Sequence, residues 1–498
     1  MQQTAQEQVG IPDSVYKNRY VILAIVLIGV LMSVLDGFMV SIALPTITTH
    51  FNVNIVQSQW IITSYLVVMT GLFIFFGKVS EYSGNAKLFM AGWALFTLSS
   101  LACGFAASIN ELILFRIIQA VGASMVAGVS GAIIFHSFPP SEIGKAMGYF
   151  GVVTAIGFLI GPGLGGFITN LIGWQYIFLV NVPIGVILLV CALKYLKIPE
   201  NTSKSFNMDW TGAIMLVISV ATLILFFSEL ASGLVITVPL TVYGVIFVFS
   251  LIAFLLQESK CKNPMLDLSI FRNRMFSLPV LSLLIFTMAL NMAFVIGPFY
   301  FQGVMDYNPS QVGLLFMLVP LTMIFAAPMG GMLYDRYHSK YAAGLGVLIS
   351  AVSFILLGYA YLIMNLGLMV IALLLWGVGN GLFTSPNNTE TLSALPREKT
   401  AIASSVSTTA KSLGGALGVS FASIFMTISL NTAGYSGEVL SASPSLLSNS
   451  ISIIMFITGV LCIISAVVAV LRNIKGNSVL YGQLGEMQEL SSEEHLED

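Results

Sequence analysis

Long apolar runs recur along nearly the whole chain, and they constrain its fold more than any other feature. Between Tyr20 and Arg472 the sequence alternates between mostly apolar stretches and short polar breaks. A helix needs about 20 such residues to cross the hydrocarbon core of a bilayer. Since 57% of the 498 residues are hydrophobic and only 8% are charged, lipid must solvate most of the surface. Little sequence remains for a globular domain.

The apolar runs predict an all-α polytopic membrane protein with fourteen transmembrane helices. Their approximate ranges are 20–45, 56–77, 86–107, 112–135, 146–169, 174–196, 210–231, 235–256, 276–301, 311–333, 341–363, 366–386, 402–428 and 451–472. The first 20 residues are polar and lack a small-residue cleavage site, so the first run is expected to be a retained span. An even number of spans places both termini on one side.

The distribution of Lys and Arg predicts that this side is the cytoplasm. With the N-terminus inside, every Lys and Arg except Arg116 lies in or beside a cytoplasmic segment, or, for Lys411, in the inner turns of its helix. The expected outer loops contain neither residue type. Short cytoplasmic loops retain positive charge in this way, so we expect a multi-pass protein of the plasma (inner) membrane with both termini cytoplasmic.

A short repeat suggests a duplicated helical unit. The segment GKVSEYSGNAK from Gly77 to Lys87 is similar to GMLYDRYHSK from Gly331 to Lys340, and each follows an even-numbered span. Parallel duplication of a six-helix half produces such a pattern. The expected organisation is a cytoplasmic segment (1–19), an N-terminal half (20–196), an inserted transmembrane hairpin (210–256), a C-terminal half (276–472) and an acidic cytoplasmic tail (473–498).

Asp36 is an acidic residue within the first span, in LMSVLDGFMVSIALP. A carboxylate is costly in hydrocarbon, so acidic residues in spans usually face the bundle interior and have a function. Helical spacing places Met32, Met39 and Ala43 on the same face as Asp36. We expect Asp36 to take up and release protons during transport. The alternative is a structural acid that is permanently paired with a base.

Arg116 is the one basic residue in the middle of a span, in LILFRIIQAVGAS. Its guanidinium stays charged in proteins and needs an acid, a carbonyl or water nearby. Two roles remain open at this point. Arg116 either pairs with an acid during the transport cycle or fixes helix packing through Gln119 and backbone carbonyls.

A glycine stripe runs through the fifth span, in GFLIGPGLGGF. Gly157, Gly161 and Gly165 are four residues apart and therefore share one helical face, with Pro162 and Gly166 beside them. Small residues allow close helix contact, and a proline favours a bend. We expect a tight seam that seals the pathway near its outer end.

Residues that line a substrate site are harder to choose from a sequence. Met32, Met39, Asn291, Tyr300 and Gln302 are candidates, because they are polarizable, polar or aromatic groups within spans. Anchoring at the membrane interface explains Tyr300 equally well.

These segments together resemble the major facilitator superfamily, and within it the fourteen-helix drug:proton antiporters of the EmrB/QacA type. LDGFMVSIALP resembles the group's first-helix signature, LILFRIIQAVG its fourth-helix motif and GFLIGPGLGGF its antiporter motif. Further similar segments are GWQYIFLVNVPIG, MDWTG and NPMLDLSIFRNR. The resemblance covers most of the chain between Leu35 and Gly418.

The resemblance implies two gating loops, with Gly77, Glu81 and Gly84 in the first and Asp335 and Arg336 in the second. It also implies alternating access between two halves, in which protons are exchanged for hydrophobic or cationic small molecules. The expected partners are the substrate, protons and the bilayer, with no cofactor, metal or nucleic acid, and the protein is expected to act as a monomer. Sodium coupling stays open.

Three other classes of function are alternatives to this one. A channel or passive scaffold would not need a lone acid such as Asp36 amid apolar helices. An exporter or importer of one endogenous metabolite would have the same fold. A membrane enzyme would need a catalytic cluster, whereas His50, His136, His338 and His495 are scattered at span ends and in the tail.

Overall fold

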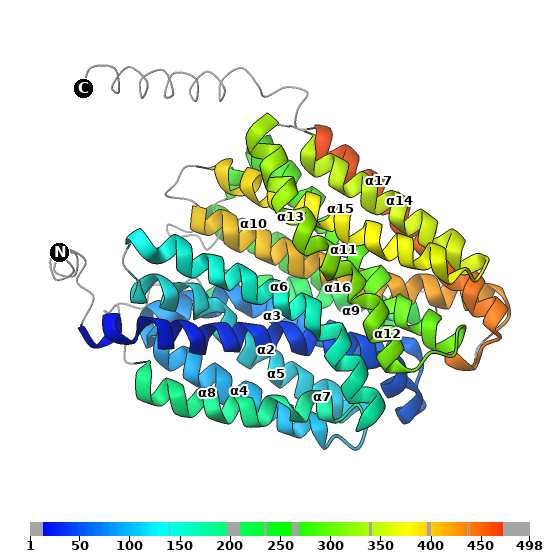
Figure 1. Cartoon of the computed structure of the whole chain (residues 1–498), viewed down its shortest axis with the longest axis horizontal. Helices are drawn as coiled ribbons and strands as arrows, with labels where there is room; N and C mark the ends of the chain where they lie inside the picture. Colours follow the sequence, from blue (N-terminus) through cyan, green and yellow to red (C-terminus); the bar gives the residue numbers. More distant parts are fainter. Residues whose placement is uncertain are drawn as a thin grey trace.

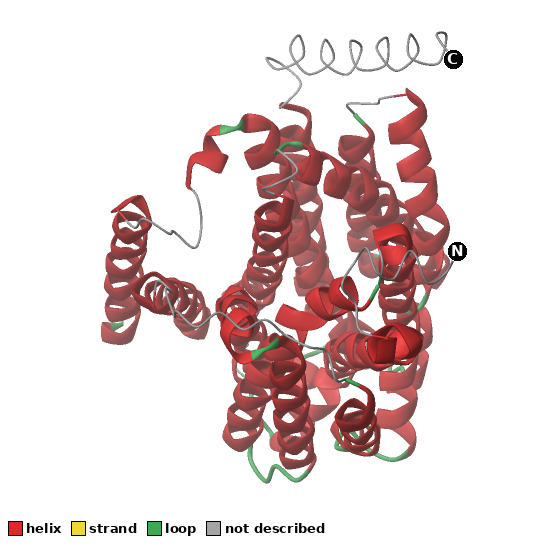
Figure 2. Cartoon of the chain, turned by 90° about the vertical axis from the view of Figure 1, so that its left-hand side faces the viewer, coloured by secondary structure: helices red, strands yellow, loops and turns green. Residues whose placement is uncertain are grey.

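The computed structural model describes residues 13–138, 140–196, 210–233, 237–260, 268–337, 341–395, 400–435, 437 and 439–471. Helices make up nearly all of this part of the chain, and no strand occurs in it (Figure 2). The helices lie roughly along one direction in two groups. Helices α2 to α8 form the first group and α11 to α17 form the second, on opposite sides of the molecule (Figure 1).

The first helix group contains seven helices. They are α2 (Asp13–Phe51), α3 (Ile55–Ser83), α4 (Asn85–Gly104), α5 (Ile109–Ser137), α6 (Pro140–Leu171), α7 (Tyr176–Leu179) and α8 (Asn181–Tyr195).

A helical hairpin and the second helix group follow. The hairpin consists of α9 (Trp210–Gly233) and α10 (Val238–Lys260), and the 3-10 turn η1 (Leu268–Arg272) comes after it. The second group is α11 (Arg274–Gly303), α12 (Pro309–Phe316), α13 (Leu318–Tyr337), α14 (Ala342–Leu362), α15 (Leu366–Ser393), α16 (Thr400–Thr432) and α17 (Pro444–Leu471), with the 3-10 turn η3 (Val439–Ser441) before α17.

Twelve stretches of described helix are long and apolar enough to cross a membrane. Each of the fourteen expected ranges overlaps a helix, and the two ranges outside the twelve correspond to α6 and α9. Their described apolar stretches, Ile156–Leu171 and Ile214–Phe227, are shorter than the other spans. The helices containing them are 32 and 24 residues long.

Two of the expected spans are interrupted by a short break. The range 174–196 is divided at Val180 between α7 and α8, and the range 311–333 is divided at Met317 between α12 and α13. A proline follows each break by three residues, Pro183 and Pro320. Because proline has no N–H, the carbonyl four residues earlier loses its helical donor, which explains why the helix is interrupted just there.

The helix pairings of the first group recur in the second. In the first group α2 packs on α6, α3 and α4 pack on α5, and α4 packs on α8. In the second group α11 packs on α16, α13 and α14 pack on α15, and α14 packs on α17. The same order of pairing along two separate stretches of chain is the pattern expected of a duplicated unit.

Several helix pairs join the two groups in the described part of the chain. They are α2 with α11 and α12, α3 with α16, and α6 with α12 and α13. Helix α9 packs on both α3 and α16. An apolar cluster that includes Val220, Ile224 and Ala416 fills this contact. The hairpin therefore packs, through α9, against the boundary formed by α3 and α16.

The first segment predicted as a gating loop is largely helical. We expected a loop from Gly77, but α3 continues to Ser83 and the chain turns at Gly84, whose φ is 91°. Lys78, Glu81 and Tyr82 are compatible with a helix, and glycine adopts a positive φ without the steric cost that other residues pay. The chain therefore turns at Gly84 and not at Gly77. In the second group α13 likewise extends to Tyr337, past Asp335 and Arg336.

Candidate functional site

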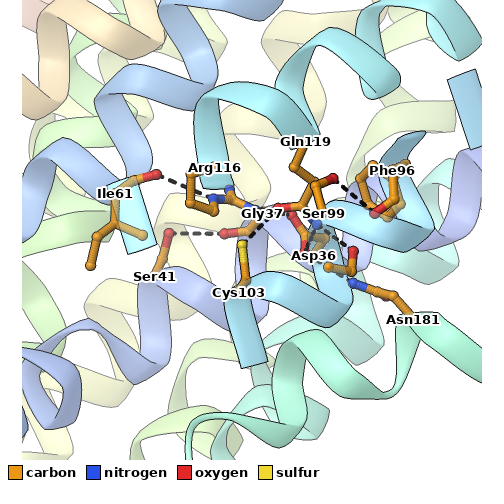
Figure 3. Close-up of polar contacts among 11 residues, drawn as sticks. Asp36, Gly37, Ser41, Ile61, Phe96, Ser99, Cys103, Arg116, Gln119 and Asn181 are labelled. Atoms are coloured by element: carbon orange, nitrogen blue, oxygen red, sulfur yellow. Dashed lines mark hydrogen bonds and ion pairs between the residues drawn. The ribbon is translucent and has the colours of Figure 1, made fainter. Parts of the chain in front are cut away.

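Asp36 and Arg116 form a buried ion pair inside the first helix group. Arg116 Nη1 lies 2.6 Å from Asp36 Oδ2, and the two residues are 1% and 0% exposed (Figure 3). Asp36 comes from α2 and Arg116 from α5. Burying two charges is favourable only when each is paired and hydrogen-bonded, so the remaining polar atoms of this site must also be accounted for.

Two amide side chains complete the bonding of the pair. Gln119 Oε1 accepts from Arg116 Nη1 at 2.6 Å, and Gln119 Nε2 lies 3.2 Å from Asp36 Oδ1 and 2.7 Å from Ser100 Oγ. Asn181 Nδ2 donates to Asp36 Oδ1 at 3.1 Å. Both carboxylate oxygens of Asp36 thus accept hydrogen bonds, and the donors lie on α5 and α8 (Figure 3).

The guanidinium of Arg116 has further contacts that do not depend on Asp36. Its Nε donates to the carbonyl oxygen of Ile61 at 3.3 Å, and its charge lies 4.1 Å from the centre of the Tyr65 ring and 5.6 Å from that of Phe178. Cation–π contacts of this length are attractive, more so away from water. Arg116 would therefore keep several partners if Asp36 were protonated.

Arg116 makes contacts of the kind that both of the roles left open by the sequence require. The residue pairs with an acid, and it also binds Gln119 and a backbone carbonyl. Adding a proton to Asp36 would remove the charge attraction between α2 and α5 while leaving the hydrogen bonds of Arg116 to α3 and Gln119. The arrangement can therefore convert a protonation event into a change in helix packing.

The glycine stripe of α6 packs against α2, within the first group. A Cβ at Gly157 would lie 2.8 Å from Val34 Cγ1, one at Gly161 would lie 2.9 Å from Phe38 Cβ, and one at Gly165 would lie 2.6 Å from Met39 Cα. These separations are too short for any side chain to fit without a shift. The close helix contact is therefore present, with the helix that carries Asp36 as its partner, while a role of these glycines in sealing the pathway stays a prediction.

A second face of α6 meets the other helix group. A Cβ at Gly166 would lie 3.1 Å from the Cα of Ser310, and one at Gly313 would lie 3.1 Å from the carbonyl carbon of Pro162. Ser310 Oγ also lies 3.3 Å from the carbonyl oxygen of Gly166. Gly166 and Pro162 thus allow α6 and α12 to approach closely across the boundary between the groups.

Polar contacts between the groups gather at one end of the bundle, which carries the α2–α3 and α11–α12 connections. We call it the α2–α3 end, and the sequence predicts it to be the outer end. Thr46 Oγ1 lies 3.4 Å from Gln302 Oε1, and Gln302 Nε2 lies 3.4 Å from the carbonyl oxygen of Ile42. Ser423 on α16 donates to Gln59 on α3. The two groups are therefore in contact at the α2–α3 end.

The structure places the five residues predicted to line a substrate site in different surroundings. Met32 and Met39 are buried, at 4% and 1% exposure, and Met39 packs on α6. Tyr300 is fully buried, stacks on Tyr361 with ring centres 3.8 Å apart and donates to the Tyr361 carbonyl. Tyr300 is thus a core residue of the second group.

The other two predicted lining residues are partly buried. Asn291 Nδ2 donates to the Thr287 carbonyl at 2.9 Å on its own helix and faces Gly415 of α16. Gln302 takes part in the contact with Thr46 at the α2–α3 end. The surroundings of Gly77 and the side chains of Glu81, Asp335 and Arg336 lie outside the part of the structure that is described.

Sequence reasoning did not identify several residues of the Asp36 site and of the boundary between the groups. Asn181 is a polar residue in an otherwise apolar run, and that contrast was the available signal. Phe38 lies with its ring 5.0 Å from both Phe158 of α6 and Phe294 of α11, so this aromatic trio joins the two groups. Aromatic residues are too frequent in these spans for the trio to be recognised without the fold.

A family comparison decides the class of protein. The sequence model described as Major Facilitator Superfamily matches residues 26–419, well over half of the chain. The chain belongs to the major facilitator superfamily. It is therefore a multi-pass membrane transporter and not an enzyme.

Relatives of this transporter carry names that state different functions. It is 34% identical over 420 residues to the riboflavin transporter RibZ of Clostridioides difficile (strain 630), covering 83% of this chain and 90% of that protein. It is 29% identical over 403 residues to the multidrug export protein EmrB of Escherichia coli (strain K12), covering 80% and 78%.

The solved structures support the fold. A bacterial homologue of the human lysosomal transporter Spinster, solved in an inward-facing and unoccupied conformation, is similar with a TM-score of 0.66 and 15% sequence identity. The match covers 91% of this chain and 96% of that one. At this identity, the similarity concerns the arrangement of the helices alone.

Proposed function

We propose that this transporter is a secondary active exporter that exchanges protons for hydrophobic small molecules by alternating access. The observation that carries the proposal is the buried contact between Asp36 and Arg116, which places one protonatable group on a helix that also packs against the second group. An intramembrane acid with a defined basic partner is typical of proton-coupled carriers.

The proposed cycle has two states that differ at the α2–α3 end. In the structure this end is held by Thr46 with Gln302 and by the close approach of Gly166 to Ser310. We infer that protonation of Asp36 weakens the packing of α2 against α5 and changes the relative stability of the two states. Substrate binding shifts the same equilibrium in the opposite direction, so protons and substrate are exchanged across the membrane.

Two classes of substrate deserve comparison. The similarity to EmrB supports multidrug export, and the 34% identity to RibZ supports the transport of one metabolite of the riboflavin type. A preference for cationic compounds has less support, because Asp36 already contacts Arg116, Gln119 and Asn181. The second candidate function, which the similarity to RibZ supports, is the transport of one specific aromatic heterocycle.

The remaining parts of the proposal concern organisation. We propose fourteen spans in the plasma membrane, with both termini cytoplasmic and the α2–α3 end outside. The halves at 20–196 and 276–472 would rock about the boundary between them, with the hairpin at 210–256 beside it. The recurrence of the helix pairings in α2–α8 and α11–α17 supports this division. A monomer without a cofactor is sufficient for this cycle.

The proposal is tested by transport in proteoliposomes with an imposed pH gradient. Asp36→Asn keeps the size of the side chain but cannot exchange a proton at neutral pH, so we expect it to insert and fold yet lose gradient-driven transport. Asp306→Asn is the matched control, because Asp306 is an exposed residue whose φ of 55° asparagine readily adopts.

Two substrates distinguish the candidate functions. Riboflavin and the dye Hoechst 33342 are assayed in parallel with the wild-type protein. Transport of both supports a multidrug range, whereas transport of riboflavin alone supports the specific carrier. Gradient-driven transport that survives in Asp36→Asn would refute proton coupling through this residue, and a sodium gradient applied to the same liposomes tests the other coupling ion.

A further inference from the structure

Lys411 places a positive charge between the two helix groups, away from the pair formed by Asp36 and Arg116. The residue lies on α16 of the second group, and its Nζ lies 5.6 Å from the centre of the Phe158 ring on α6 of the first group. The side chain keeps an exposed surface, although it points from one helix group toward the other. An exposed side chain that contacts the opposite helix group can be reached by a molecule lying between the two groups.

No acidic partner accompanies this charge in the part of the chain that the structure describes. Lys411 has no ion pair or side-chain hydrogen bond there, and its one described contact is with the Phe158 ring. A cation without a counter-charge among membrane-spanning helices is costly. A lysine that only relieved this cost would extend to the lipid headgroups, whereas Lys411 reaches across to the other helix group.

Aromatic rings surround the same boundary. Phe158 forms an edge-to-face contact with Phe38, and Phe38 forms another with Phe294 of α11, each with ring centres 5.0 Å apart. All three phenylalanines are only partly buried. One turn along α16 from Lys411, Gly415 leaves the amide of Asn291 without a side chain in front of it, since a Cβ at Gly415 would lie 3.4 Å from Asn291 Nδ2.

We propose that Lys411 is a substrate-binding residue that recognises the negative charge of an aromatic anion, with Phe158 and Phe38 contacting its ring. The substrate class is a planar aromatic compound that bears a carboxylate, a phosphate or a phenolate. The anion supplies the counter-charge that Lys411 lacks, and a charge-assisted hydrogen bond to an ammonium is stronger than a neutral one. The proposal rests on the transport function proposed above and specifies its substrate class.

The consequence for specificity is a discrimination by charge. A cationic drug entering the same space would meet Lys411 at close range and would be repelled, because like charges are poorly screened away from water. The aromatic trio alone would accept either compound. Lys411 therefore determines which sign of charge is preferred.

The test uses two xanthene dyes with similar ring systems and opposite charge, fluorescein as the anion and rhodamine 123 as the cation. Equilibrium binding of each dye to the purified full-length protein in lipid nanodiscs is measured by fluorescence polarisation near neutral pH. We expect the wild-type protein to bind fluorescein about tenfold more tightly than rhodamine 123, the size of effect that one charged hydrogen bond gives.

Three variants test whether Lys411 causes this preference for the anionic dye. Lys411→Gln should lose about tenfold in fluorescein affinity and gain affinity for rhodamine 123, and Lys411→Arg should restore the preference for fluorescein. Lys194→Gln is the control, because Lys194 is an exposed lysine near the end of α8 that also contacts an aromatic ring, at 5.1 Å from Tyr195. It should bind both dyes as the wild-type protein does.

The outcomes separate this proposal from the transport function. Binding needs no gradient, so a failure of proton-driven transport in Asp36→Asn liposomes leaves the dye result intact. The proposal is overturned when Lys411→Gln weakens both dyes equally, when it changes neither, or when the wild-type protein prefers rhodamine 123. Binding of rhodamine 123 by Lys411→Gln also shows that this variant is folded.

Discussion

Asn181 Nδ2 donates to Asp36 Oδ1 over 3.1 Å, although the two residues are 145 positions apart in the chain. Arg116 binds the other oxygen of the same carboxylate at 2.6 Å. Asp36 is therefore fixed from two helices, α5 and α8, and the loss of one contact does not set it free. A proton that neutralises Asp36 acts on both contacts at once.

The Asn181 contact predicts a loss of stability on truncation. Asn181→Ala leaves Asp36 Oδ1 with Gln119 as its remaining described donor, and removing one partner of a buried charged acceptor costs about 1 to 3 kcal/mol. Thermal unfolding in detergent should therefore show a lower Tm. Asn110→Ala is the control, because Asn110 is exposed near the start of α5. Equal Tm values for the two variants would contradict the assigned role.

Replacing Arg116 by lysine is expected to impair transport without preventing folding. Arg116→Lys keeps the charge, but a lysine cannot bind Asp36, Gln119 and the Ile61 carbonyl with the fixed geometry of a guanidinium. We expect a folded protein whose gradient-driven transport falls by about tenfold or more, because one lost charged hydrogen bond has that size. Arg19→Lys, outside this site, should transport as the wild-type protein does. Normal transport by Arg116→Lys would show that the charge alone is sufficient.

Two glycine substitutions should change stability in opposite directions. Gly165→Ala forces a Cβ to within 2.6 Å of Met39 Cα, and overpacking of this kind costs about 1 to 3 kcal/mol. At Gly131 of α5 a Cβ would have no atom within 4 Å, so Gly131→Ala should gain up to about 1 kcal/mol from helix propensity. Thermal unfolding of both variants checks the signs, and a stable Gly165→Ala protein would mean that α2 and α6 can separate at no cost.

The contact between Thr46 and Gln302 predicts a cross-link that stops transport. In a background without the native cysteines, Thr46→Cys combined with Gln302→Cys should react with a short bifunctional methanethiosulfonate reagent, because Thr46 Oγ1 and Gln302 Oε1 are 3.4 Å apart. Cross-linking should abolish proteoliposome transport, and a reducing agent should restore it. Transport by the cross-linked protein would exclude opening at the α2–α3 end. Each single cysteine variant controls for the reagent.

Hydropathy alone was enough to predict the all-helical membrane fold. Apolar runs report burial in lipid directly, and the twelve long apolar stretches of described helix lie where runs were expected. The breaks at Val180 and Met317 were missed, because a single proline changes the local backbone without changing the hydropathy of the run. The continuation of α3 past Gly77 also has no hydropathy signal, because charged residues end an apolar run without ending the helix.

The candidate site was predictable in part. Asp36 and Arg116 were found because charges are rare in spans, but their pairing depends on how α2 and α5 pack, which no local pattern encodes. Lys411 was assigned only to the inner turns of its helix, because its distance to Phe158 depends on two helices from different groups. Tyr300 has the aromatic character of a lining residue and is nevertheless part of the core.

The position of α9 has a consequence for the lipid around the protein. Helix α9 covers the boundary between α3 and α16, with Phe227 packed against Phe421 at a ring distance of 4.9 Å, while the boundary between α6 and α12 has no such hairpin among its described contacts. The two flanks of the transporter therefore offer unequal routes to a molecule dissolved in the bilayer. An amphiphile that diffuses sideways within one leaflet would find the α3–α16 flank shielded, so any lateral entry of substrate should be one-sided.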